Sequence, residues 1–382
     1  MQENFPNIVS KIRELYGEGF IPLHAPYFGG NEKKYLNDCI DSTFVSSVGQ
    51  YVNLFEQKLA EFTGAKYAIA TVNGTSALHV SLILAGVEAN DEVLTQALTF
   101  VATSNAISYI GASPVFIDVD RDTMGLSPEK LENFLTNETV MNADGFCYNK
   151  STGKRIKACV PMHTFGIPLR ISEVVSICKQ HNIIVVEDTA ESLGSYVNNI
   201  HTGNFGQLAA FSFNGNKTIT CGGGGAIITN DETLAKRAKH LTTTAKSPHP
   251  YEFYHDEIGY NYRMPNLNAA VACAQLEQLD LFLKNKRITA EKYSSFFKEI
   301  GVDFVNENPN TKANYWLNAI VLKNKEERDS FISYTNDHEI MTRPIWILMN
   351  RLPAFKNAQT DDLSNSYWLE ERVVNIPSSY RQ

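Results

Sequence analysis

Short apolar runs alternate with longer helical patterns between Lys66 and Thr229. The runs are rich in β-branched residues, and the segments between them carry apolar residues every three to four positions. This alternation is typical of a mainly parallel sheet covered by helices. The expected strands are KYAIATV, DEVLT, SPVFIDV, KACVPM, NIIVVE, QLAAFSF and GGAIIT, and the expected helices are TSALHVSLILAG, FVATSNAISYIGA, SPEKLENFL and RISEVVSICKQH. The pattern therefore predicts an α/β fold with a mainly parallel seven-stranded sheet.

The pattern changes near residue 250. A loop-like stretch, TTTAKSPHPYEFYHDEIGYNYRMP, precedes one long helical pattern, NLNAAVACAQLEQLDLFLKNKRITAEKYSSFFKEI. Mixed segments such as YWLNAIVL and KEERDSFISYTND follow. We expect an N-terminal segment and a large domain over residues 1–250, and a linking helix with a smaller α+β domain over residues 251–382.

The composition of the chain argues against several classes of protein. The chain has 382 residues, is 43% hydrophobic and 20% charged, and carries a net charge of −8, which gives no reason to expect nucleic acid. Its six cysteines show no Cys-x-x-Cys spacing, so neither a zinc site nor a disulfide framework is predicted. No apolar segment approaches the roughly 20 residues of a membrane span, and the start lacks a signal peptide. We expect a cytoplasmic protein without membrane contact.

The first candidate site follows the strand KYAIATV. The turn Asn73-Gly74-Thr75-Ser76 leads into a helix, so its free backbone N–H groups and two hydroxyls face an incoming anion, and a phosphate would fit there. The alternative is that Thr75 and Ser76 only cap the helix.

The second candidate is the acidic cluster VVEDTAESLG, in which an apolar strand runs directly into Asp188. A buried carboxylate needs a cationic or hydrogen-bonding partner, and the protonated nitrogen of a pyridine cofactor is one such partner. The alternatives are a helix cap or a metal ligand. No histidine stands at matching spacing, so we do not expect a metal.

The third candidate is FSFNGNKTITCGGGG, in which Lys217 precedes four glycines. A phosphate-binding P-loop is excluded, because the glycine before the lysine is misplaced and a strand rather than a helix follows. A lysine on a turn at the sheet edge can instead form a Schiff base with an aldehyde cofactor. Two roles stay open for the glycines, namely close passage of the backbone and room for a substrate.

A phosphate turn, a strand-end aspartate and a lysine, in this order, resemble fold-type I enzymes that use pyridoxal 5′-phosphate (PLP). From about Ile21 onward the chain resembles the DegT-type nucleotide-sugar aminotransferases. The resemblance rests on FIPLHAPYFGGNE, VSSVGQYVNLFEQKLAEFTGAKYAIATVNGTSALH, TFVATSNAISYIGASPVFIDVD, VEDTAESLG, SFNGNK and GYNYRMPNLNAA. Within that family, PMHTFG, FSFNGNK and MTRPIW are similar to the aminotransferases of legionaminic-acid-type pathways.

The resemblance implies roles for the residues around PLP. Lys217 would form the Schiff base and move the proton, and Asp188 would pair with the pyridine nitrogen. Glu191 would lie near the phenolic oxygen, where many members have glutamine or histidine. Phe100 would stack on the ring, although without the motif it would be taken for a core residue. The phosphate would be held by Gly74, Thr75, Ser76 and Ser212, joined by Asn261 of a second subunit in a homodimer with shared active sites.

The resemblance also suggests a substrate side. His163 in PMHTFG would lie near the cofactor, and Tyr315 and Arg343 would line the sugar-nucleotide pocket. The alternatives are that His163 is a structural residue and that Arg343 pairs with an acidic neighbour.

The implied reaction moves an amino group, with glutamate as the expected donor, to the C4 ketone of a nucleotide-linked 4-keto-6-deoxy-N-acetylhexosamine during synthesis of a bacterial surface sugar. UDP and GDP both stay open. The alternatives are a 3-keto-sugar aminotransferase and a non-catalytic sugar-nucleotide-binding regulator. Related dehydratases carry histidine in place of the lysine, so Lys217 favours amino transfer.

Overall fold

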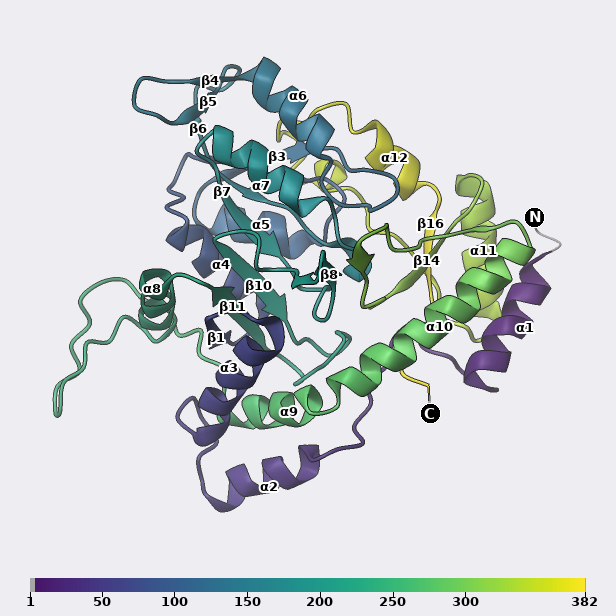
Figure 1. Ribbon diagram of the computed structural model, residues 1–382, viewed down its shortest axis with the longest axis horizontal. Coiled ribbons are helices and arrows are strands. Elements are labelled where there is room, and N and C mark those ends of the chain that lie inside the picture. The colour runs from purple at the N-terminus through teal and green to yellow at the C-terminus, as the bar shows by residue number, and fades with distance from the viewer. Residues whose placement is uncertain (1–3, 382) are drawn as a thin grey trace.

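A central sheet with helices on both faces forms the larger part of the molecule (Figure 1). The computed structural model describes residues 4–381. Along the sheet the strands follow the order β1 (Tyr67–Thr71), β11 (Gly225–Thr229), β10 (Leu208–Ser212), β7 (Ile184–Asp188), β6 (Arg155–Val160), β2 (Glu92–Gln96) and β3 (Ser113–Ile117). Strand β11 is antiparallel to both neighbours, and the pairings from β10 to β3 are parallel. The hairpin of β4 (Thr139–Met141) and β5 (Cys147–Asn149) adds to β6.

Alternate residues of these strands are buried on opposite faces, which explains why the strands read as continuous apolar runs. On one face, residues such as Val186 and Ala210 pack under α4 (Gly74–Leu84), α5 (Val101–Tyr109) and α8 (Glu232–Thr242). On the other face, Phe211 and Val185 pack under two groups of helices, which are α2 (Glu32–Asp41), α3 (Gln50–Thr63) and α9 (Asn266–Leu276), and α6 (Pro128–Glu138) and α7 (Ile171–Gln180). The predicted α/β fold and its seven main strands are confirmed.

The long helical pattern that the sequence predicts is two helices. Helix α9 ends at Leu276 and α10 (Leu279–Glu299) begins three residues later. At the break, Gln278 donates a hydrogen bond from Nε2 to Glu32 Oε1 at 2.7 Å. The helical periodicity continues across this junction, so the sequence pattern alone does not reveal the change of direction.

The smaller part of the molecule contains a four-stranded sheet in the order β12 (Asp303–Phe304), β14 (Asn318–Val321), β16 (Val373–Ile376) and β15 (Arg343–Pro344). It is joined by α10, α11 (Lys325–Asp337), α12 (Ser364–Glu370) and the short helix η3 (Met349–Arg351), whereas the short helix η2 (Thr164–Gly166) lies between β6 and α7. A separate three-stranded sheet links β13 (Thr311–Lys312) with β8 (Tyr196–Val197) and β9 (Ile200–His201).

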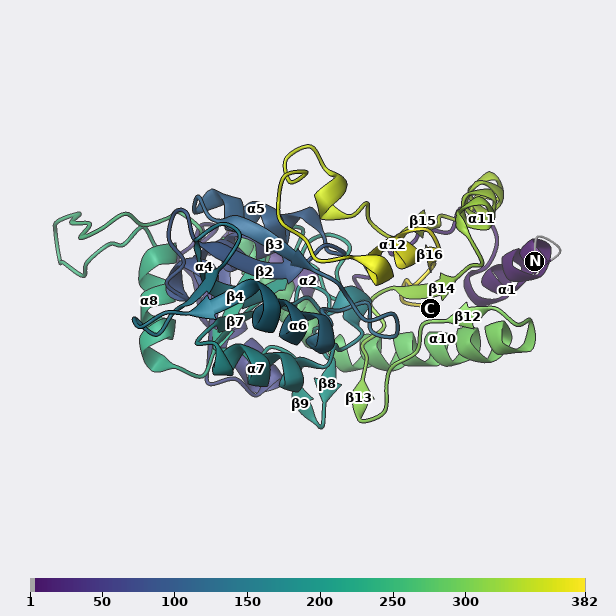
Figure 2. The same ribbon diagram turned by 90° about the horizontal axis from the view of Figure 1, so that it is seen from above.

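The expected domain boundary at residue 250 stays a prediction. Two helices pack on the other side of it from their place in the sequence. Helix α1 (Phe5–Tyr16) lies beside α11 (Figure 2), and Ile8 and Ile12 share a core with Phe297 and Phe331. Helix α9, in contrast, packs with α3 against the large sheet. Among residues 4–381, no helix is both long and apolar enough to cross a membrane.

Candidate active site

A cavity of about 380 Å³ lies where β1, β10 and β7 end. Seven of the residues singled out from the sequence line it, namely Gly74, Thr75, Phe100, Asp188, Glu191, Ser212 and Lys217. The carboxyl ends of parallel strands meet at one edge of a sheet, and ligands of open α/β folds bind there. Three motifs that are far apart in the sequence are therefore brought to one place.

The turn before α4 has the geometry of an anion site. Asn73 caps the helix, because its Oδ1 accepts a hydrogen bond from Ser76 N at 2.8 Å. A Cβ atom on Gly74 would lie only 2.8 Å from Ser212 Cβ, so glycine allows the turn and β10 to approach closely. The positive end of the helix dipole points into this space. Ser76 itself is buried and does not line the cavity, and its N–H is already bound.

The four glycines after Lys217 include one with a clear steric role. A Cβ atom on Gly225 would lie 2.4 Å from the backbone carbon and oxygen of Asn73. Glycine therefore lets β11 pass directly against the phosphate turn, which supports close passage of the backbone as the role of this position. A Cβ on Gly222 would meet nothing within 4 Å, so no such contact explains that residue.

Asp188 ends β7 and is buried at the floor of the cavity. Its Oδ2 accepts a hydrogen bond from Thr103 Oγ1 at 2.7 Å, and its Oδ1 accepts one from Ala190 N at 3.1 Å. Burial raises the pKa of Asp188, and these two bonds together with Lys217 oppose that rise. The sequence analysis missed Thr103.

Lys217 lies between a carboxylate and an aromatic ring. Its Nζ donates to Glu191 Oε1 at 3.2 Å and stands 4.0 Å from the centre of the Trp316 ring. Glu191 Oε2 accepts a second bond from Phe165 N at 2.8 Å. Burial raises the pKa of Glu191 to about 7, although Lys217 lowers it. Glu191 is thus a buried carboxyl group that can gain or lose a proton near neutral pH.

Replacement of Glu191 by glutamine is expected to change how stability depends on pH. Between an ordinary pKa of 4.5 and the raised value of about 7, the folded protein keeps a proton that the unfolded chain releases, so this group lowers stability as pH rises. Relative to Glu191→Gln, the PLP-free wild type should lose about 2–3 kcal/mol between pH 4.5 and 8. Urea unfolding across that range measures the difference. The exposed Glu299→Gln is the control, and parallel curves for wild type and Glu191→Gln would contradict the prediction.

Aromatic rings form the outer wall of the cavity. Phe100 has 51% of its surface exposed, which excludes a role in the core. The ring centre of Phe100 is 6.4 Å from the ring centre of Trp346. The ring centres of Trp346 and Phe165 are 5.0 Å apart. Trp316 and Trp346 come from the small part of the chain, and both line the cavity. The sequence analysis assigned no role to either tryptophan, nor to Leu78, Met162, Asn214 and Asn216.

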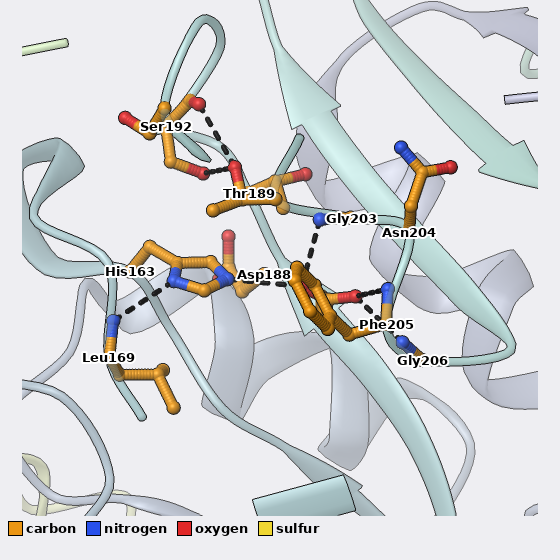
Figure 3. A network of polar contacts seen from close by, with 12 residues as sticks. His163, Leu169, Asp188, Thr189, Ser192, Gly203, Asn204, Phe205 and Gly206 are labelled. Carbon is orange, nitrogen blue, oxygen red and sulfur yellow. Dashed lines mark hydrogen bonds and ion pairs between the residues drawn. The ribbon is translucent and has the colours of Figure 1, made fainter. Parts of the chain in front are cut away.

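His163 does not line the cavity, and its predicted role in substrate binding stays a prediction. Its ring is fully buried, and Figure 3 shows its polar contacts. Nδ1 accepts a hydrogen bond from Leu169 N at 3.3 Å, which leaves the proton on Nε2, 3.1 Å from Glu187 Oε2. Glu187 also accepts bonds from the backbone N–H groups of Gly203, Phe205 and Gly206. His163 is therefore part of a buried network beside β7, as the structural alternative held.

Glu187→Gln is expected to destabilise the protein by about 2–4 kcal/mol. The carboxylate accepts from three backbone N–H groups and one imidazole, and an amide would turn an NH₂ group toward some of these donors. Urea unfolding measures the loss, with the exposed Glu132→Gln as the matched control. Equal stability of the two variants would refute a stabilising role for the network.

Two other predicted substrate residues also lie outside the cavity lining. The Tyr315 hydroxyl accepts a hydrogen bond from Glu307 N at 3.3 Å, on the side of Arg287. Arg343 is exposed on β15 and donates to Asn336 Oδ1 at 2.9 Å, an amide rather than an acidic neighbour. Asn261 is exposed and does not line the cavity of its own chain. The expected absence of a metal stays a prediction.

The profile of the DegT/DnrJ/EryC1/StrS aminotransferase family matches residues 26–381. The chain belongs to this family. It is 37% identical to a GDP-perosamine synthase of Escherichia coli O157:H7, covering 94% of this chain and 93% of that protein. It is 35% identical to a GDP-perosamine synthase of Vibrio cholerae, covering 94% of each. The crystal structure of a DegT DnrJ EryC1 StrS aminotransferase from Brucella abortus is 26% identical, with a TM-score of 0.81 and coverage of 91% of this chain and 90% of that one.

Membership makes the protein a sugar aminotransferase, an enzyme class that uses PLP to aminate the keto group of a nucleotide sugar. The residues present fit that cofactor. A buried carboxylate, Asp188, suits a cationic ring nitrogen, and Lys217 suits the aldehyde. The glycine cradle at Gly74, beside a helix N-terminus, suits the phosphate.

Proposed function

We propose that the enzyme transfers an amino group from L-glutamate to the C4 ketone of a nucleotide-linked 4-keto-6-deoxyhexose. The observation that carries this proposal is the convergence of Lys217, Asp188 and the N-terminus of α4 on one cavity. The aromatic wall formed by Trp316, Trp346 and Phe100 supports a substrate with apolar C–H faces, as a deoxy sugar has.

In this proposal each side chain of the cavity has a separate role in the reaction. When bound, PLP withdraws electrons from the carbon that loses its proton. Asp188 holds a proton on the ring nitrogen, and Phe100 orients the ring. Lys217 Nζ takes the proton from the reacting carbon and returns it, with Glu191 3.2 Å away as the group that stabilises its ammonium form.

The phosphate is held by the backbone at the start of α4 and by the hydroxyls of Thr75 and Ser212, both of which line the cavity. Gly74 keeps this turn close to β10. Ser76 contributes to the site by its place in the capped first turn, since its own N–H is bound to Asn73.

Two acceptor sugars are candidates. The motifs PMHTFG, FSFNGNK and MTRPIW favour the N-acetylated sugar of legionaminic-acid-type pathways. The identity of 37% and 35% with two GDP-perosamine synthases favours the GDP-linked keto sugar that precedes perosamine.

A transaminase assay with glutamate distinguishes these candidates. The purified enzyme is incubated with UDP-linked 4-keto-6-deoxy-N-acetylhexosamine, with GDP-linked 4-keto-6-deoxymannose or with a 3-keto sugar nucleotide, and the product is identified by NMR. We expect a 4-amino sugar from one of the first two. A 3-amino product, or a deoxy sugar without an amine, would overturn the proposed reaction.

We also propose that the enzyme works as a homodimer in which Asn261 completes the partner's phosphate site. Tyr260 and Tyr262 pack against His79 of α4, with ring centres 5.0 and 5.9 Å from it, and Asn261 between them is exposed. The segment after α8 projects from the molecule (Figure 1), and its Tyr251 and Phe253 are 91% and 81% exposed. Exposed aromatic side chains of this kind support burial against a second copy.

Subunit complementation tests the shared site. Lys217→Ala and Asn261→Ala homodimers should each be strongly impaired. After unfolding and refolding as an equal mixture, half of the dimers are mixed, and each mixed dimer has one site with both residues, so about a quarter of wild-type activity should return. A mixture no more active than the sum of its parts would place Asn261 in its own subunit's site or outside catalysis.

A further inference from the structure

Lys286 is a buried lysine outside the cavity that holds the catalytic groups. It lies on α10 with 2% of its surface exposed. Its Nζ donates to His24 Nε2 and Ser378 O at 2.7 Å each, and to Trp316 O at 3.1 Å. Burial lowers the pKa of Lys286 to about 7, and three acceptors are enough for the three N–H donors of its charged form. When Lys286 is charged, His24 Nε2 accepts this bond, and His24 Nδ1 has no hydrogen-bond partner among residues 4–381.

The three acceptors come from distant parts of the sequence. His24 precedes α2, Trp316 precedes β14 and Ser378 follows β16. One side-chain amine thus joins the N-terminal segment, the small sheet and the C-terminal segment to α10. A buried amine is costly unless it is hydrogen-bonded, so its presence among three acceptors points to a specific positional role.

Trp316 connects this cluster with the active site. Its indole Nε1 donates to Asn216 O at 2.6 Å, next to Lys217 in the chain. The same ring lies 4.0 Å from Lys217 Nζ and lines the main cavity. Behind Lys217, a separate cavity of about 10 Å³, close to the size of one water molecule, is lined by Lys217, Lys286 and His24. The two lysines therefore border the same small space.

We propose that Lys286 is a positioning residue for Lys217 and acts through Trp316. The Lys286 amine fixes the Trp316 carbonyl, and the Trp316 side chain fixes both the backbone before Lys217 and one side of the Lys217 amine. The inference rests on the proposed covalent role of Lys217.

A double-mutant cycle tests this coupling. PLP is added to PLP-free Lys286→Met, Trp316→Phe and the double variant, the covalent linkage at Lys217 is trapped with borohydride, and its rate of formation is measured by mass spectrometry. Each single change should slow linkage roughly tenfold, and the double variant should be little slower than the slower single variant, because coupled residues are not additive. Lys284→Met, an exposed lysine on the same helix, should link at the wild-type rate.

Thermal unfolding gives the melting temperature of each variant, and all linkage rates are measured well below it. A slower rate then reflects the position of Lys217 and not unfolded protein. If Lys286→Met does not fold, Lys286→Gln takes its place in the test. Its amide keeps donors for two acceptors, so PLP linkage should proceed at a rate between those of the wild type and a variant without donors. A folded Lys286 variant that links at the wild-type rate, or slowdowns that multiply in the double variant, would overturn the inference. A wild-type protein that never links PLP at Lys217 would instead refute the proposed function.

Discussion

Lys217→Ala is expected to abolish amino transfer, with a loss of at least about 10³-fold in kcat. Among residues 4–381, Lys217 is the one lysine that lines the main cavity, so no other amine of that cavity can take its place. The variant should also lose the covalent linkage to PLP and the visible absorbance that accompanies it. Glutamate-dependent amination and borohydride trapping measure the two losses separately.

Lys179→Ala, an exposed lysine on α7, is the matched control and should behave as wild type. Since Lys217→Ala shortens a side chain that lines a cavity, the variant should fold, and added PLP should still bind without a covalent bond. A coloured, active Lys217→Ala protein would remove this residue from the chemistry.

Asp188→Asn is expected to lower kcat by about 10²–10³-fold while leaving PLP attached to Lys217. Asparagine can still accept a bond from Thr103 or Ala190, so the local structure should persist. It carries no negative charge, however, and so cannot keep the ring nitrogen protonated. The loss should appear in the half-reaction with glutamate and in the half-reaction with the sugar, measured by single-turnover absorbance changes.

The exposed Asp337→Asn on α11 serves as the control for the Asp188 variant. Asp188→Asn that retains wild-type rates in both half-reactions would show that Asp188 only supports the structure. Loss of PLP linkage together with activity would instead indicate that the carboxylate is needed to assemble the site.

The strands and the central catalytic groups could be predicted from the sequence for a common physical reason. Strands buried on both faces read as apolar runs, and the residues that follow parallel strands gather at one edge. Asp188, Ser212 and the turn before α4 therefore met as expected, with Lys217 on the turn after β10.

The substrate wall could not be predicted in the same way, because it comes from irregular segments of the small part of the chain. There the sequence analysis chose Tyr315 and Arg343, whereas Trp316 and Trp346 line the cavity. Tyr315 has a φ of 49°, a left-handed backbone conformation that no regular period describes. Without a helical or strand period, the direction of a side chain cannot be read from its spacing.

The packing of α1 against α10, α11 and β16 sets the order in which a growing chain can mature. The ribosome makes α1 well before Phe297, Phe331 and Val374, which cover it. Residues of the large sheet can associate during synthesis, whereas Ile8 and Ile12 remain without their native cover until α10, α11 and β16 have been made. Trp316 and Ser378 belong to the late segments. The catalytic lysine is thus translated well before the protein has the parts that hold it in place.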